Sequence, residues 1–211
     1  MSNPIIPLFP LSIVVFPEQA VPLHIFEERY KAMIADCRAT ELGGDPQPFG
    51  ISLQGEKSIH QVGCAVLLHQ VLREYPDGRL DIIGIGCRRF RCGEIFEDKP
   101  YFTAAIEYFD DEDEETEPEL AENTHALFTE LLAALKEKDD TTKAEQLPPG
   151  SFQLAARIAL APLQKQQLLE MTSETERLES LSGHLQELIP AVHEHQENMR
   201  KVRSNGRPKK I

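Results

Sequence analysis

The hydrophobic positions in the first half of the chain follow the short, alternating pattern of β-strands. The longest apolar stretch covers residues 5–15, and prolines at positions 7 and 10 interrupt it. Because proline lacks a backbone N–H, we expect this strand to lie at a sheet edge or at a bulge. Five further strands are predicted over residues 49–53, 64–75, 80–86, 87–96 and 101–109.

A helix and a tight turn organise these strands. Apolar residues recur at steps of three and four between residues 26 and 38, which predicts one early helix. The sequence Pro76-Asp77-Gly78 has the backbone preferences of a tight turn and predicts a hairpin. Six strands with one early helix indicate a closed or nearly closed β-barrel, because closure removes exposed sheet edges.

After residue 109 the hydrophobic pattern changes to the period of helices. Ser151 is a predicted helix cap, and Ser173 with Glu176 forms a capping box for the last helix. Pro190 is expected to kink that helix or to restart it. We therefore predict an α+β chain with a barrel over 1–109, an acidic linker over 110–118, a helical bundle over 119–202 and a disordered basic tail over 203–211.

The net charge of −13 is unevenly distributed, since residues 107–119 contain no basic residue and residues 200–211 contain no acidic one. An acidic body argues against broad binding to nucleic acid. No segment reaches the ~18–20 apolar residues that span a membrane, and the N-terminus lacks the basic start of a signal peptide. The four cysteines lack metal-site spacing, so we expect reduced thiols in a cytoplasmic protein.

The motifs of common catalytic sites are missing from this sequence. It has neither a phosphate-binding G-x-x-x-x-G-K-[ST] loop nor a G-x-S-x-G nucleophile turn, so we expect a non-enzymatic protein without a cofactor. His193 and His195 lie two residues apart, which on a helix turns their rings ~200° from each other. We therefore expect no metal site there, only a solvated helix end.

The most promising binding surface is a proline-broken apolar stretch. Its members are Phe16, Pro17, Val21, Pro22, Ile25 and Phe26, and His24 adds a polar contact. If the stretch lies on the barrel rim with apolar side chains exposed, it is suited to bind extended or unfolded peptide. The alternative is that these residues pack the early helix onto the barrel, since large apolar side chains are mostly buried.

Two neighbouring arginines are the other candidates. Arg88 and Arg89, with Arg91 on the same strand, could bind phosphate or an acidic peptide. The alternative is a polar strand face whose arginines pair with acids such as Asp81 or Glu94.

Several short motifs, taken in order, resemble the N-terminal domain of Lon protease, the substrate-recognition part of an ATP-dependent protease. The resemblance covers about residues 4–195. Each motif alone is weak, but the ordered set is specific. The motifs are Pro7-Leu8-Phe9-Pro10, Phe16-Pro17, Pro22-Leu23-His24-Ile25-Phe26-Glu27, Arg29-Tyr30, Met33, Asp36-Cys37, Phe49-Gly50, Val62-Gly63-Cys64-Ala65, Asp77-Gly78-Arg79-Leu80, Gly86, Arg89-Phe90-Arg91, Lys165-Gln166, Leu168-Leu169-Glu170 and Arg177-Leu178.

The resemblance implies a PUA-like β-barrel followed by a helical bundle. In that family this domain recognises protein substrates, while the ATPase and protease domains lie downstream, and no catalytic residue matches here. The leading hypothesis is a stand-alone, non-catalytic module that binds unfolded or extended polypeptide. Protease components are its expected second class of partner. The alternatives are an RNA-binding module, by analogy with PUA-like barrels elsewhere, and a purely structural or regulatory oligomer.

Overall fold

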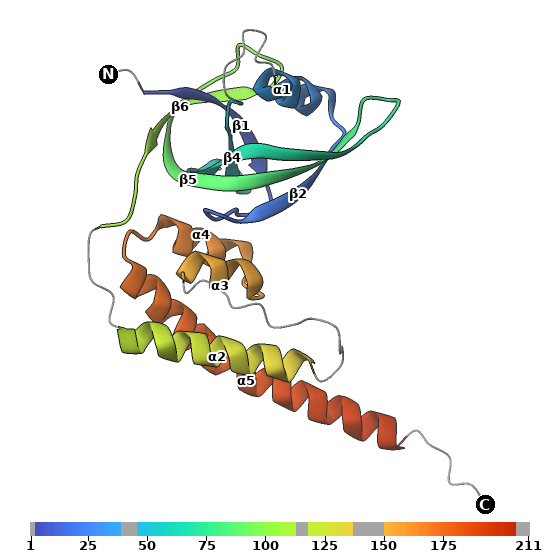
Figure 1. Cartoon of the computed structure of the whole chain (residues 1–211), viewed down its shortest axis with the longest axis vertical. Helices are drawn as coiled ribbons and strands as arrows, with labels where there is room; N and C mark the ends of the chain where they lie inside the picture. The colour runs from blue at the N-terminus through green and yellow to red at the C-terminus, as the bar shows by residue number, and fades with distance from the viewer. Residues whose placement is uncertain (1–2, 39–45, 113–117, 137–149, 206–211) are drawn as a thin grey trace, which may run out of the picture. The chain divides into compact units, whose positions relative to one another are not determined.

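The computed structural model describes residues 3–38, 46–112, 118–136 and 150–205 (Figure 1). The chain divides into two compact units. A strand-rich unit comprises residues 1–112 together with 155–172, and a helical unit comprises residues 113–154 together with 173–211. The strand-rich unit therefore includes a helical segment that the sequence analysis assigned to the bundle.

Six strands form the sheet of the strand-rich unit, in the order β2-β5-β4-β3-β1-β6. An additional pairing of β5 with β6 closes five of them into a ring, and β2 is attached to β5 outside it. The predicted barrel-like closure is confirmed. The strands are β1 (Ile5–Leu11), β2 (Ala20–Ile25), β3 (Phe49–Gln54), β4 (Ile59–Glu74), β5 (Leu80–Phe96) and β6 (Phe102–Tyr108).

The positions of the prolines explain one missed strand and one wrong expectation. Strand β2 was not predicted because Pro22 interrupts it, yet β2 pairs with β5 alone, and an edge strand tolerates a missing N–H. Strand β1 was expected at an edge or at a bulge but lies between β3 and β6, in unbroken register with each. Pro7 is in register with β6 only and Pro10 with β3 only, so each half of β1 has one neighbour.

The early helix is confirmed as α1 (Glu28–Arg38). Its apolar stripe is buried in the same core as the strands, and the Tyr30 ring lies 4.0 Å from that of Phe9, measured between centroids. The predicted hairpin is also confirmed. The Tyr75 N–H donates to the Arg79 carbonyl, and Gly78 adopts a φ of 80°, which a side chain would disfavour.

The helical unit is built on α2 (Pro118–Lys136) and α5 (Glu174–Asn205), which lie side by side in Figure 1. The Thr124 hydroxyl donates to the Leu120 carbonyl of its own helix, and the Gln196 amide of α5 donates to the Ala134 carbonyl of α2. Pro190 lies inside α5 and does not end it. The buried apolar residues at the core of this pair are Phe128, Leu131, Ala134, Leu178, Leu181, Leu185 and Ile189.

Two shorter helices complete the chain. Helix α3 (Ser151–Arg157) begins in the helical unit, and α4 (Pro162–Glu170) belongs to the strand-rich unit. The hydroxyl of Ser151, the predicted cap, donates to Glu174 and accepts from the Arg177 Nε–H. One bond of the predicted capping box is present, since the Glu176 N–H donates to the Ser173 hydroxyl at 3.1 Å. Most of the predicted acidic linker and basic tail lies outside the described residues, although α5 includes positions 203–205.

None of the described helices combines the length and the apolar character that crossing a membrane requires. The four cysteines are free thiols, as predicted. Cys37 and Cys64 are buried, Cys92 is half-buried and Cys87 is exposed. Burial raises the pKa of both Cys37 and Cys64 to about 12.

We expect the native protein to react with a thiol reagent in a strict order. At about pH 8, Cys87 should be modified first, while Cys37 and Cys64 should stay protected, because they are buried and hold their protons. Mass spectrometry of the peptides after a time course measures this order, and a sample in denaturant, where every thiol reacts, is the control. Early modification of Cys64 would contradict the packing described here.

Gly86 is a close-approach position in β5. Its N–H donates to the Gln19 carbonyl, and its own carbonyl accepts from the Glu18 N–H at 2.7 Å. A Cβ added at this position would lie 2.1 Å from the carbonyl oxygen of Phe16, which is backbone and cannot rotate away. Gly183 in α5 is the opposite case, since an added Cβ would meet nothing within 4 Å beyond its chain neighbours and the local backbone of its own helix.

Gly86→Ala should therefore destabilise the strand-rich unit by about 3 kcal/mol or more, at the upper end for overpacked sites. Tyrosine fluorescence during urea unfolding measures this selectively, because the four tyrosines all lie in that unit and the chain has no tryptophan. Gly183→Ala in the helical unit is the control and should leave this tyrosine transition unchanged. Circular dichroism of the helices should show α5 stabilised by about 0.5–1 kcal/mol, since alanine is the better helix former. Equal effects of the two variants would contradict this account.

Candidate functional site

The structure divides the seven predicted site residues by exposure. Phe16, Ile25 and Arg89 are buried, with 0%, 1% and 3% of their surface accessible. Phe26 is 60% exposed, His24 and Arg88 are also exposed, and Pro17 is half-buried. Phe16 and Ile25 therefore pack in the interior, as the packing alternative states. A ligand can reach mainly Pro17, His24, Phe26 and Arg88.

His24 and Phe26 lie together at the end of β2, beside the tip of the β4–β5 hairpin. Their rings stack with centroids 5.9 Å apart, and the ring of Tyr75 meets His24 edge-on at 6.0 Å. We call His24, Phe26 and Tyr75 the aromatic surface. It arises because β2 pairs with β5 in a register that places His24 opposite Asp81, directly after the hairpin turn.

Asp81 fixes the geometry of the aromatic surface. One carboxylate oxygen lies 2.6 Å from the His24 Nδ1, and the other accepts from the Tyr75 hydroxyl at 2.7 Å. These hydrogen bonds, that of His24 first, hold the pKa of Asp81 below its usual range. The same carboxylate raises the pKa of the Tyr75 hydroxyl, which therefore remains a donor.

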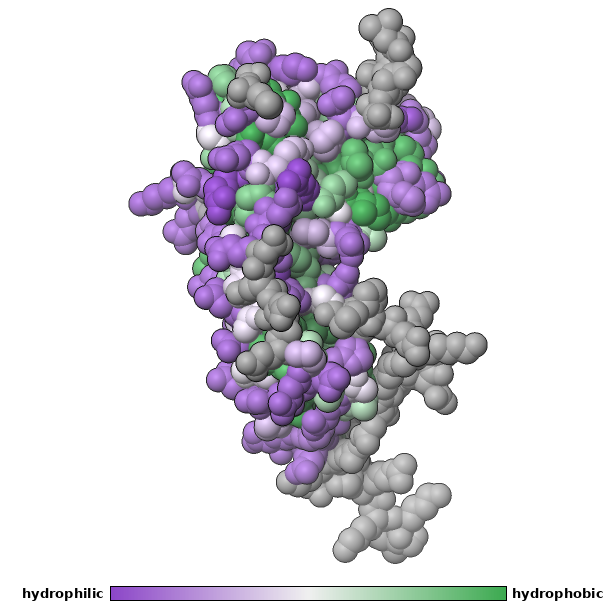
Figure 2. All heavy atoms as spheres, turned by 60° about the vertical axis from the view of Figure 1, so that its left-hand side comes forward, coloured by the Kyte–Doolittle hydropathy of each residue, from purple (hydrophilic) through white to green (hydrophobic). Residues whose placement is uncertain are grey.

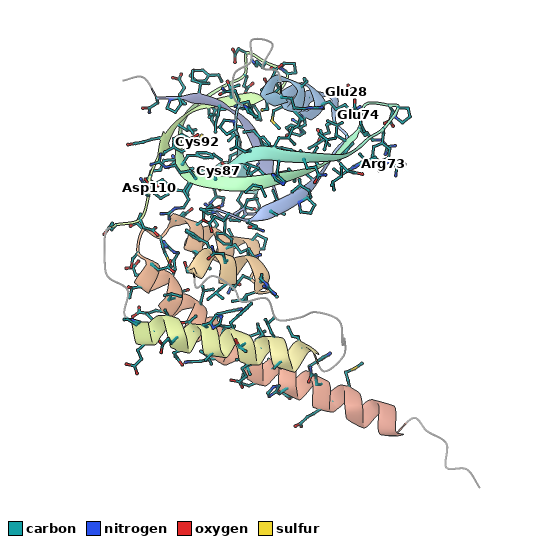
Figure 3. All side chains as sticks on the ribbon, viewed as in Figure 1. Glu28, Arg73, Glu74, Cys87, Cys92 and Asp110 are labelled. Atoms are coloured by element: carbon teal, nitrogen blue, oxygen red, sulfur yellow. The ribbon has the colours of Figure 1, made fainter. Side chains whose placement is uncertain are left out.

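Cationic side chains flank Tyr75. The guanidinium carbons of Arg73 and Arg79 lie 4.5 and 4.8 Å from its ring centroid, within the range of cation–π contacts. Figure 3 shows Arg73 and Glu74 at the hairpin end of the β4–β5 ribbon, with Glu28 of α1 on the same side. The surface thus combines an exposed apolar ring with charged groups of both signs, a composition suited to polypeptide contacts.

Sequence analysis missed Tyr75 and Asp81 as members of this surface. Their signal was the cross-strand pairing of β2 with β5, which could not be used because β2 itself was not predicted.

On the visible face of Figure 2, hydrophilic side chains dominate and the largest group of hydrophobic ones lies on the strand-rich unit.

The two arginines have different structural roles, because adjacent strand residues point to opposite sides. Arg88 is exposed and forms a bidentate ion pair with Asp110. Arg89 is buried, and its guanidinium donates to the carbonyls of Leu169 and Met171 at the end of α4 and to Asp111. The acidic partners are thus not those predicted, Asp81 and Glu94, but residues just after β6.

Arg89 secures α4 to the ring of strands. Carbonyls at a helix end lack partners within the helix, and a cation there also complements the helix dipole. A second contact supports the helix, since the Gln166 side chain donates to the Val62 carbonyl of β4 at 3.0 Å. The position of Arg89 therefore favours a structural role over ligand binding.

Among the residues that the structure describes, no three histidine, cysteine or acidic side chains come together as a metal site would require. His193 and His195 lie on the exposed part of α5. The surface chemistry available on the strand-rich unit is therefore that of apolar, aromatic and ion-pairing contacts.

Comparison with known proteins identifies relatives over most of the chain. Residues 5–187 match the family described as the ATP-dependent protease La (LON) substrate-binding domain. The Lon protease of Dictyoglomus thermophilum is 25% identical over 191 residues, and that of Escherichia coli K12 is 24% identical over 205 residues. These alignments cover 86% and 87% of this chain but only 24% and 25% of the relatives, so the chain spans about a quarter of their length.

Solved structures have the same fold. A Lon N-terminal domain protein from Xanthomonas campestris aligns with a TM-score of 0.64 and 27% identity, over 84% of this chain and 96% of that one. The N-terminal domain of the Mycobacterium avium complex Lon protease aligns with a TM-score of 0.62 and 21% identity, over 87% and 98% of the two chains.

The contrast between the two arginines gives a paired test. Arg89→Met should destabilise the strand-rich unit by roughly 2 kcal/mol or more, since it removes charged hydrogen bonds and leaves buried carbonyls without donors. Arg88→Met should have little effect, because that ion pair is exposed. Tyrosine fluorescence in urea gives the stability, and amide exchange in α4 shows whether the helix has loosened. Equal losses in both variants would refute the assigned roles.

Proposed function

Since the chain belongs to the family of Lon substrate-binding domains, we propose that it is a non-catalytic module that binds unfolded or extended polypeptide. The family is the observation that carries the proposal. It accounts for the class of ligand, whereas the Lon relatives are about four times longer and their activity as whole proteins does not transfer. The free thiols and the family together support a cytoplasmic location.

We assign polypeptide binding to the aromatic surface. Phe26 exposes 60% of its area although it is a large apolar residue, and it stacks on a His24 ring that Asp81 holds in place. A rigid, exposed aromatic group loses little conformational entropy when it makes contacts, so it serves well as a binding anchor. His24 and Phe26 are the members of the predicted set on this surface, whereas Pro17 precedes the other end of β2, near Gly86.

The RNA-binding alternative receives less support. Of the two candidate arginines that could contact phosphate, Arg89 is buried and Arg88 is paired with Asp110. The side chains of the basic tail lie outside the described residues. Protease components also remain proposed partners, by analogy with the relatives.

Phe26→Asp tests the proposal directly. We expect it to weaken binding to a permanently unfolded, carboxymethylated protein by about tenfold or more, since an apolar anchor is lost and a charge is placed in the contact. Fluorescence anisotropy of the labelled ligand measures the affinity. Ile25 should not be substituted with it, because Ile25 is buried and a change there would unfold the protein.

Leu163→Asp is the matched control. Leu163 on α4 is 63% exposed and belongs to the same unit, so the change adds the same charge on another surface. Binding should survive in this variant, and both variants should keep the unfolding midpoint of the parent. Equal loss in both would show nonspecific charge repulsion, and intact binding in Phe26→Asp would remove the aromatic surface as the site.

A further inference from the structure

We propose that the polypeptides bound at the aromatic surface are basic, and that an arginine side chain of the ligand packs on the open face of the Phe26 ring. The inference rests on the proposed function and names the chemical class of its ligand. Two independent observations carry it, the pattern of cation–π contacts in the strand-rich unit and the net charge of the chain.

The strand-rich unit covers its accessible aromatic rings with cations. Each of the four tyrosines has an arginine or lysine over its ring, at distances to the centroid that run from 4.5 Å at Tyr30 to 5.4 Å at Tyr101. Phe109 has two guanidinium groups over its ring, at 4.5 and 4.0 Å. The negative face of an aromatic ring attracts a cation at this range. An accessible ring in this unit is therefore a place where a cation is stabilised.

Phe26 is the exception to this pattern. It is the most exposed aromatic residue in the described part of the chain, with 60% of its surface accessible, yet no arginine or lysine of that part lies over its ring. One face of the ring stacks on His24, with the two planes 23° apart. The other face is open to solvent, so a ligand can supply the cation that the chain itself does not.

The groups beneath Phe26 also favour a positive ligand. The imidazole on which it stacks lies 2.6 Å, at Nδ1, from a carboxylate oxygen of Asp81. Hydrogen bonds hold the pKa of Asp81 below its usual range, so this carboxylate is ionised at neutral pH. The covered side of the stack thus carries a negative charge, and a cation on the open side is attracted to it across the two rings.

The cations around the aromatic surface are already engaged. Arg29 and Lys31 pair with the acids that follow Phe26 in the chain, and Arg79 pairs with an acid of the hairpin turn. Arg73 lies over the Tyr75 ring, opposite Asp81 in the ladder between β4 and β5. These side chains therefore offer a weak attraction to an acidic ligand.

Glu74 lies at the same end of the β4–β5 ribbon and is not engaged. It is exposed and has no hydrogen bond or ion pair with any other described residue (Figure 3). The remaining charges nearby form pairs that cancel, so the net charge of −13 sets the field that an approaching chain meets. Such a field draws basic polypeptides toward the protein and repels acidic ones.

The test uses three labelled twelve-residue peptides that share two leucines and differ at two positions, which hold arginine, its neutral isostere citrulline, or glutamate. Fluorescence anisotropy with the whole protein measures their affinities. We expect the arginine peptide to bind about fivefold more tightly than the citrulline peptide, and the glutamate peptide to bind most weakly. Raising the salt from about 0.05 to about 0.5 M should weaken the arginine peptide alone.

Phe26→Leu separates the ring from its apolar bulk. It should weaken the arginine peptide by about two- to fivefold, since an exposed cation–π contact has that strength, and leave the citrulline peptide nearly unchanged. Leu163→Ala is the control, because Leu163 is an exposed apolar residue of the same unit, and it should change neither affinity.

The remaining outcomes would overturn the inference. Equal affinities of the three peptides, with binding of the unfolded protein still lost in Phe26→Asp, would overturn it and leave the proposed function intact. A preference for arginine that survives in Phe26→Leu would place the basic ligand elsewhere and overturn the ring contact. Absence of binding by the unfolded protein and by all three peptides would overturn the proposed function as well.

Discussion

The strand-rich unit depends on β5, because this one strand pairs with β2, β4 and β6. Its first half joins β2 and β4, and its second half joins β6 and closes the ring. One edge of β5 pairs with β4, and the other pairs first with β2 and then with β6. Closing the ring through β6 requires curvature of β5, which glycines and a bulge allow. Gly86 accepts the close approach of the Phe16 carbonyl, and Gly93 lies next to the bulge. Closure of the ring and the separation of the end of β5 from β4 are therefore two results of this curvature.

The sequence predicted those parts of the fold whose signals are local. The tight turn, α1 and most strands follow from turn chemistry and from hydrophobic periods within a few residues. The single strand β5 was predicted as two pieces, because the change of partner near its middle alters the burial pattern without breaking the backbone. Strand β2 and the position of β1 depend on pairing between distant segments, and no local pattern contains that information.

The candidate site shows the same limit at the level of single residues. Phe16, Ile25 and Phe26 belong to one apolar stretch, yet the first two are buried and the third is exposed. The register of β2 and the start of α1 determine which of these side chains are buried and which is exposed. Arg88 and Arg89 are neighbours of the same type, but adjacent side chains of a strand point to opposite sides. Arg88 is therefore exposed to solvent, whereas Arg89 donates hydrogen bonds to the end of α4. The resemblance to Lon domains supplied the ligand class, whereas the aromatic surface required the structure.

The contacts of α4 have a consequence for how the protein is made. The Arg89 guanidinium meets a carbonyl 80 residues later in the chain, and the Gln166 amide meets one 104 residues earlier. During synthesis all six strands leave the ribosome before α4 does, and contacts of such long range form late in folding. The nascent strand-rich unit must therefore wait with its α4-binding face open to water. For that interval, the chain is itself an incompletely folded polypeptide of the kind that quality-control systems recognise.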